Sequence, residues 1–155
     1  MDKFVTSNKL NFQKQFTLEN LMDGYIIRST GSTPTVEFNP EEGYLDITGV
    51  STPDDPLSFY GHVFSQLHKF EKYKNEVITI NFGLKNMTGS TTYIYILVKK
   101  LISLQNDSRE VVFNWFYEKN NEKILDAGKE ISEHYNHPFK FIGVYKIKPQ
   151  LRQAS

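Results

Sequence analysis

Short β-branched runs alternate with longer stretches in which apolar residues recur at helical spacing, and this alternation constrains the fold most strongly. Within residues 77–82, Val77, Ile78, Ile80 and Phe82 form a short, strongly β-branched run that suits a strand buried on both faces. The next stretch has one apolar stripe, made of Ile94, Leu97, Val98, Leu101 and Leu104. Strands that alternate with helices favour a partly parallel sheet packed with helices. The sequence therefore predicts an α/β domain.

The predicted order is β-β-α-β-α-β-α-β, a mixed sheet with about three helices. A hairpin of strands at 35–38 and 45–48 precedes a helix that Asp55 caps and Pro56 begins. The remaining elements are expected at 77–82 (strand, broken by residues 83–89), 90–104 (helix, capped by Ser90), 111–117 (strand), 122–135 (helix) and 139–145 (strand). Residues 1–28 are interpreted as an N-terminal extension, 29–146 as the domain and 147–155 as a frayed tail.

Composition and charge exclude several functions. The 155 residues include no cysteine, which excludes disulfides, thiol nucleophiles and cysteine metal sites. Eighteen basic residues balance eighteen acidic ones, so no net field attracts nucleic acid or an anionic membrane. No apolar run approaches the roughly 18 residues of a membrane span. We expect a soluble cytoplasmic protein that binds neither nucleic acid nor membrane.

The sequence has none of the common signatures of catalysis. It lacks the P-loop, the dinucleotide-binding glycine pattern, the nucleophile elbow and the zincin motif. His62 and His68 lie six positions apart, on different faces of one predicted helix, so they do not form a metal-binding pair. His134 and His137 are three positions apart, but Pro138 indicates that their helix is already ending there. We therefore expect no catalytic residue, no metal site and no cofactor.

The junction between the strand at 77–82 and the next helix has an unusual density of hydroxyl groups. Thr88, Ser90, Thr91 and Thr92 place four hydroxyls within five residues. Capping by Ser90 explains part of this pattern. The same geometry would suit a phosphorylation site, or an anion-binding loop over Thr88–Thr92 in a small-molecule-binding domain.

Two apolar residues of this helix point away from its buried stripe. Tyr95 and Ile96 lie beside Lys99 and Lys100 on the other side of the helix. Exposed apolar residues next to a hydroxyl-rich cap can form a docking surface. A helix covered on both sides by its own domain would explain them equally well.

Several segments, in one order, resemble the SiaC family of bacterial regulatory phosphoproteins. They are residues 32–38, 43–51, 59–60, the hydroxyl-rich junction, 114–117, 126–130 and 138–139, so the resemblance spans roughly Ile27 to Tyr145. It implies a fold similar to STAS domains, the fold of anti-anti-sigma factors. It also implies that the threonine of an Asn-Thr-Ser-Ser motif is phosphorylated by a partner kinase and dephosphorylated by a metal-dependent phosphatase.

Aligning the lysine-bearing helix places the phosphorylated threonine on Thr88. Met87 stands where the family usually has asparagine, and Gly89 where it has the first serine. Ser90 and Thr91 are the alternative acceptors. In the best-known branch of the family the unphosphorylated form binds and activates a diguanylate cyclase.

The resulting hypothesis is a non-enzymatic partner switch controlled by a serine/threonine kinase and a phosphatase. Its predicted partner-binding residues are Gly89, Ser90, Tyr93, Tyr95 and Ile96. The alternatives are an anion-binding α/β domain that uses the Thr88–Thr92 loop, and a constitutive adaptor that binds the same output protein without a switch.

Overall fold

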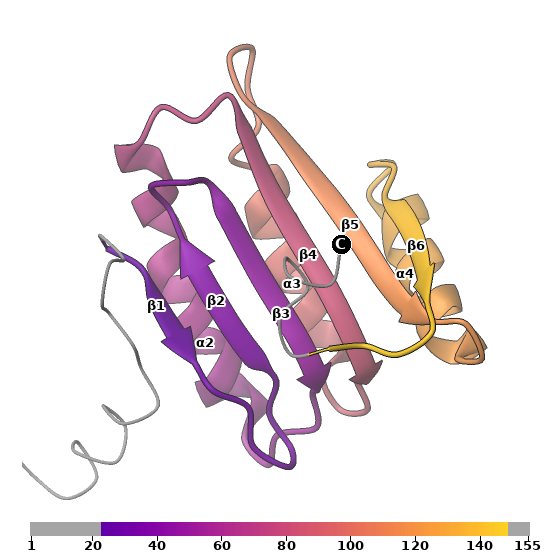
Figure 1. Ribbon diagram of the computed structural model, residues 1–155. Helices are drawn as coiled ribbons and strands as arrows, with labels where there is room; N and C mark the ends of the chain where they lie inside the picture. Colours follow the sequence, from indigo (N-terminus) through magenta and orange to yellow (C-terminus); the bar gives the residue numbers. More distant parts are fainter. Residues whose placement is uncertain (1–22, 149–155) are drawn as a thin grey trace, which may run out of the picture.

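The computed structural model in Figure 1 describes residues 23–148, which form a six-stranded sheet with helices on one face. The strands lie in chain order across the sheet. They are β1 (Tyr25–Ile27), β2 (Thr35–Asn39), β3 (Tyr44–Val50), β4 (Val77–Asn86), β5 (Glu110–Glu118) and β6 (Lys140–Val144). β1, β2 and β3 pair antiparallel, whereas β3, β4, β5 and β6 pair parallel. The predicted mixed α/β fold is confirmed.

The hairpin forms where the alternating pattern predicts it. Val36 pairs with Ile47, and Phe38 pairs with Leu45. All four side chains are fully buried, because period-2 alternation sends them to the same face of the sheet.

Three α-helices cover the face that receives these side chains: α2 (Pro56–Gln66), α3 (Thr91–Ile102) and α4 (Glu122–His134). α2 begins as predicted, since the Asp55 carboxylate accepts hydrogen bonds from the Ser58 amide at 3.1 Å and the Ser58 hydroxyl at 2.8 Å. These bonds hold the pKa of Asp55 below its usual value. The first predicted helix changes character after Gln66 and continues as a 3₁₀ helix, η1 (Leu67–Lys72).

The described residues extend the predicted domain at both ends. Tyr25–Ile27, assigned from sequence to the N-terminal extension, pairs with β2 as an edge strand. Ile147, assigned to the frayed tail, is 3% exposed, and its amide donates to the Glu118 carboxylate at 2.9 Å. The chain after β6 crosses the sheet near the carboxyl ends of its central strands (Figure 1). Residues 1–22 of the predicted extension and 149–155 of the tail lie outside the described residues.

β4 is longer than predicted. The expected break at residues 83–89 starts too early, because Gly83–Asn86 continue the strand. Gly83 pairs with Thr48 of β3 and with Phe116 of β5, and Leu84 is fully buried. Two neighbouring strands and a core side chain outweigh the low β-propensity of glycine.

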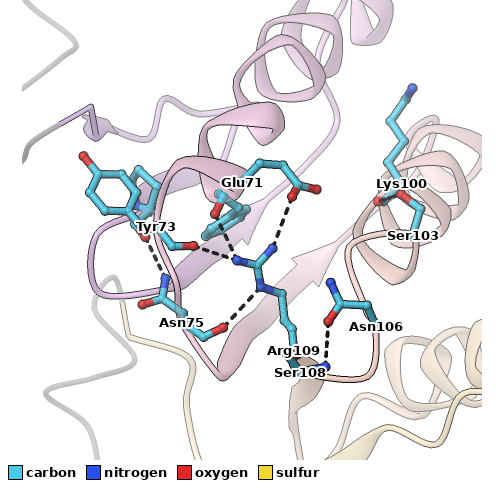
Figure 2. A network of polar contacts seen from close by, with 10 residues as sticks. Glu71, Tyr73, Asn75, Lys100, Ser103, Asn106, Ser108 and Arg109 are labelled. Atoms are coloured by element: carbon cyan, nitrogen blue, oxygen red, sulfur yellow. Dashed lines mark hydrogen bonds and ion pairs between the residues drawn. The ribbon is translucent and has the colours of Figure 1, made fainter.

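At the amino edge of the parallel strands, Arg109 joins the start of β5 to the segment between η1 and β4 (Figure 2). Its guanidinium donates to the carbonyl oxygens of Tyr73 at 2.6 Å, Asn75 at 3.2 Å and Phe70 at 3.5 Å. A fourth contact, at 3.5 Å, joins it to the Glu71 carboxylate. The Arg109 side chain is 9% exposed, so it satisfies backbone carbonyls that surround the end of η1 and the start of β4.

Candidate functional site

The hydroxyl-rich loop lies at the opposite, carboxyl edge of the parallel strands. β4 ends at Asn86, and residues 87–90 lead directly into α3. β4 lies between β3 and β5, so the segments that follow these two strands flank the loop on either side. Loops at the carboxyl ends of parallel strands are the usual location of binding sites in α/β sheets.

Thr88 is exposed and held by the residue that ends β4. The Asn86 side-chain oxygen accepts hydrogen bonds from the Thr88 amide at 2.9 Å and from the Thr88 hydroxyl at 2.7 Å. This arrangement is a local turn of the kind that asparagine favours. It presents the Thr88 side chain at the surface before the helix begins.

Gly89 is exposed and provides the backbone conformation that the loop requires. Its φ is +82°, in the left-handed region where a side chain is strained, although no atom lies within 4 Å of the position of an added Cβ. Glycine is therefore needed here for its backbone and not for close packing.

Ser90 is fully buried, so it is not accessible to a kinase or a partner in this conformation. Its hydroxyl donates to the Ser51 carbonyl oxygen at 2.9 Å and lies 2.9 Å from the Ser51 hydroxyl, which is 2.5 Å from the Tyr60 hydroxyl. Each hydroxyl has one hydrogen, so Tyr60 donates to Ser51 and Ser51 donates to Ser90. The predicted roles of Ser90 as acceptor, partner contact and side-chain cap are not supported, since its hydroxyl is used inside the domain.

This hydroxyl chain of Tyr60, Ser51 and Ser90 joins α2, the end of β3 and the start of α3. Burial raises the pKa of Tyr60 to about 12, against the opposing effect of its hydrogen bonds to Ser51 and Ser90. Tyr60 therefore stays neutral and continues to donate across the physiological pH range. The base of the Thr88 loop is thus fixed on the side that faces β3.

Met87, the residue before Thr88, points into the protein. It is 7% exposed and belongs to the main hydrophobic core. The residue before Thr88 therefore anchors the loop by apolar burial.

The predicted partner-binding residues of α3 lie on different flanks of the helix. Tyr93 stacks on Tyr60 of α2, with ring centroids 6.1 Å apart. Tyr95 instead packs against His134 of α4 at 5.3 Å, and its carbonyl oxygen accepts a hydrogen bond from the Tyr135 hydroxyl at 2.8 Å. The pKa of Tyr95 is raised, first by burial and then by Glu130 and Tyr135. Tyr93 and Tyr95 consequently do not form one patch.

The outward side of α3, opposite its buried stripe, carries a different set of residues. Helical geometry places Ile96 there together with exposed Thr92 and Lys99, with Tyr95 at the border. We call these four residues, Thr92, Tyr95, Ile96 and Lys99, the α3 ridge. Tyr95 and Ile96 are both half-buried, so the ridge combines apolar surface with polar groups.

A hollow of about 350 Å³ lies beside Thr88, between the start of α3 and the start of α4. Thr88 and Thr91 line one side, and Lys85 and Lys123 contribute its charged groups. The Asn121 side chain bridges the two sides, because it donates to the Lys85 carbonyl oxygen at 3.1 Å and accepts from the Ile124 amide at 3.2 Å.

Sequence reasoning did not include Lys85, Asn121 and Lys123 in the site. Lys85 precedes the end of β4, and Asn121 follows β5 closely. The carboxyl ends of neighbouring parallel strands lie at one edge of a sheet, so the predicted topology contained a signal that these residues gather near Thr88.

Two other predicted features concern metals and membranes. Among residues 23–148, no group of three or more histidine or acidic side chains is arranged to hold a metal ion. Within that same range, the helices are too short or too polar to cross a bilayer.

Comparison with known proteins identifies relatives with the same fold. The structure resembles apo-SiaC from Pseudomonas aeruginosa, with 22% identity, a TM-score of 0.66, and coverage of 79% of this chain and 98% of that one. It also resembles the crystal structure of the diguanylate cyclase SiaD in complex with its activator SiaC from the same species. That match has 22% identity, a TM-score of 0.68 and coverage of 77% and 98%.

Sequence comparison gives the same assignment. An uncharacterized protein of Pseudomonas aeruginosa (strain UCBPP-PA14) is 24% identical over 114 residues, which are 73% of this chain and 90% of the relative. The model of the SiaC family of regulatory phosphoproteins matches residues 27–144, which include every strand from β2 to β6 and the Thr88 loop. The chain belongs to the SiaC family of regulatory phosphoproteins.

Proposed function

We propose that the protein is a non-enzymatic partner switch, controlled by reversible phosphorylation of Thr88. The observation that carries this proposal is the contrast within one loop of a regulatory phosphoprotein family member: Thr88 is exposed, whereas Ser90 is fully buried. Thr91 and Thr92 are exposed as well, but both belong to the first turn of α3. Thr88 is therefore the exposed hydroxyl residue of the loop itself.

A serine/threonine kinase would add the phosphate and a metal-dependent phosphatase would remove it. In the forward step the Thr88 Oγ1 bonds to the γ-phosphorus of ATP, the bond from that phosphorus to ADP breaks, and the hydroxyl proton is released. Hydrolysis by water restores the hydroxyl and releases inorganic phosphate. Because the kinase uses ATP, the proposal places the protein in the cytoplasm.

The modification changes the loop in two ways. Phosphothreonine has no hydroxyl hydrogen, so the 2.7 Å bond from Thr88 to Asn86 is lost. The phosphate also adds about −1.5 to −2 charges at pH 7. A partner that contacts Gly89 and the α3 ridge would therefore meet a different charge and loop conformation in the two states.

The output partner that we propose is a diguanylate cyclase, bound by the unphosphorylated form. SiaC of Pseudomonas aeruginosa has been solved in complex with such an enzyme and is described as its activator. The α3 ridge supplies a mixed apolar and polar surface next to Thr88, which suits a docking site.

Phosphosite mapping tests the switch. Protein isolated from its native cells is analysed by mass spectrometry with and without phosphatase treatment, and we expect phosphate on Thr88. A Thr88→Ala variant should remain bound to its output protein when the kinase is active. A Thr88 that is unmodified in every growth condition would refute the switch and favour the constitutive adaptor.

Binding measurements with a diguanylate cyclase from the same organism test the docking surface. Ile96→Lys should weaken binding at least tenfold, because it places a charge in the apolar part of the α3 ridge. Val77→Lys is the control, since Val77 is also an exposed apolar residue but lies at the opposite edge of the sheet. Equal effects of the two variants would exclude the ridge as the docking site.

A further inference from the structure

The hollow beside Thr88 has a single sign of charge. Of the described residues that line it, the charged ones are Lys85 and Lys123. Both side chains are exposed, and within the described part of the chain neither forms an ion pair with a carboxylate. Two cationic groups, unpaired among the described residues, therefore lie around the proposed phosphorylation site.

The two lysines come from different elements but are held in fixed relation. Lys85 precedes Thr88 by three positions on β4, and Lys123 lies in the first turn of α4. Asn121 joins these elements through its bonds to the Lys85 carbonyl oxygen and the Ile124 amide. The backbone positions of both lysines are thus set before any phosphate is present.

We propose that Lys85 and Lys123 bind the phosphate of phosphorylated Thr88 within this hollow, an inference that rests on the proposed function. Ammonium groups form charge-assisted hydrogen bonds with phosphate oxygens, and these are roughly twice as strong as neutral ones. Once the dianion is bound, the charge of the hollow changes from that of two free lysines to nearly neutral. A partner that binds at the carboxyl edge of the sheet would then meet two fewer accessible cations, in addition to the phosphate.

The pKa of the phosphate itself gives a direct test. Phosphothreonine is incorporated at position 88 during translation, so the protein is uniformly modified without any kinase. The second ionisation of a phosphate ester has a pKa near 6, and nearby cations lower it because they favour the dianion. In the phosphorylated chain that keeps Lys85 and Lys123, titration followed by ³¹P NMR should give a phosphate pKa about one unit below this reference value.

Matched variants separate the two lysines from general charge effects. The double variant Lys85→Gln, Lys123→Gln should return the pKa to about 6. The control is Lys99→Gln, Lys129→Gln, which removes the same charge from exposed positions on α3 and α4. Lys129 is six residues beyond Lys123, about 9 Å further along the helix and on another face. The control should keep the lowered value.

Each other outcome overturns the proposal. A wild-type pKa near 6 means that no cation binds the phosphate, and a lowered pKa that persists in the Lys85, Lys123 variant assigns the effect to other groups. Equal shifts in both double variants indicate a general field. These results leave the phosphosite mapping unaffected, because translation and not a kinase supplies the phosphate here.

Discussion

Ser90 donates its hydroxyl hydrogen to the carbonyl oxygen of Ser51 at 2.9 Å, although 39 positions separate the two residues. The bond joins the start of α3 to the end of β3 and completes the buried hydroxyl chain that begins at Tyr60. It fixes one side of the Thr88 loop, whereas the Asn121 bond to Lys85 fixes the other. Thr88 is therefore an exposed side chain on a well-anchored backbone.

Removal of the Ser90 hydroxyl should destabilise the fold. Ser90→Ala leaves the buried Ser51 carbonyl oxygen and hydroxyl without this partner, and we expect a loss of about 1–3 kcal/mol in the free energy of unfolding. Thr92→Ala, at an exposed position in the same helical turn, should change it by less than about 0.5 kcal/mol. Urea denaturation measures both variants. Equal stability of Ser90→Ala and the wild type would show that the buried bond contributes nothing net.

A substitution at Gly89 measures backbone strain alone, because an added side chain would not clash with any neighbouring atom. Gly89→Ala should lower the free energy of unfolding by about 1–2 kcal/mol, because alanine is strained at a φ of +82° although its Cβ has free space. Gly31→Ala is the control, since that position is equally open but has no left-handed φ, and its effect should be within about 0.5 kcal/mol. Thermal unfolding compares the pair. Similar values for both variants would contradict the strain argument.

Two helical glycines should respond to alanine with opposite signs. At Gly128 an added Cβ would lie 2.5 Å from the ring of Trp115, whose indole nitrogen donates to the Ile124 carbonyl oxygen at 2.9 Å. Gly128→Ala should therefore cost about 2–3 kcal/mol through overpacking. Gly61 in α2 has no atom within 4 Å of that point, so Gly61→Ala should stabilise the protein by about 0.5–1 kcal/mol. Calorimetric midpoints that shift in one direction for both would refute this assignment.

Arg109 acts through the shape of its guanidinium more than through its charge. Arg109→Lys keeps the charge but cannot donate to three carbonyl oxygens in the observed arrangement, so we expect a loss of about 2–4 kcal/mol in unfolding free energy. Glu71→Ala removes only the contact to an exposed carboxylate and should cost less than about 1 kcal/mol. Unfolding in guanidinium chloride measures the stability of both variants. A lysine variant as stable as the wild type would show that charge alone suffices.

Alkaline pH should weaken the fold through Tyr60. Its pKa is about 12 in the folded protein and near 10 when unfolded, so the neutral form is favoured by folding. This contribution is fully present below pH 10 and is lost as the pH rises to about 12. Tyr60→Phe should make the decline in unfolding free energy over this range shallower, as followed by urea denaturation at successive pH values. An unchanged slope would mean that Tyr60 does not ionise on unfolding.

Local patterns determined most elements, and together with the family resemblance they determined the candidate threonine. Two-residue alternation predicts the β2–β3 hairpin, and apolar spacing with Asp55 and Pro56 predicts the start of α2. The density of hydroxyl groups at residues 88–92 indicates a functional loop, and the family resemblance indicates Thr88 within it. These features depend on near neighbours in the chain, so they are legible in the sequence.

Tertiary structure decided which of these residues are available. In the sequence, the residues before and at the start of α3 form a run rich in hydroxyl groups. In the structure, the Ser90 hydroxyl is buried and hydrogen-bonded to Ser51, whereas Thr88 lies at the surface. Neighbouring helices likewise place Tyr93 against α2 and Tyr95 against α4. Lys85 and Lys123 line the same hollow because β4 and β5, which precede the two sides of it, are adjacent parallel strands. Burial and long-range pairing depend on the whole sheet, so local sequence cannot specify them.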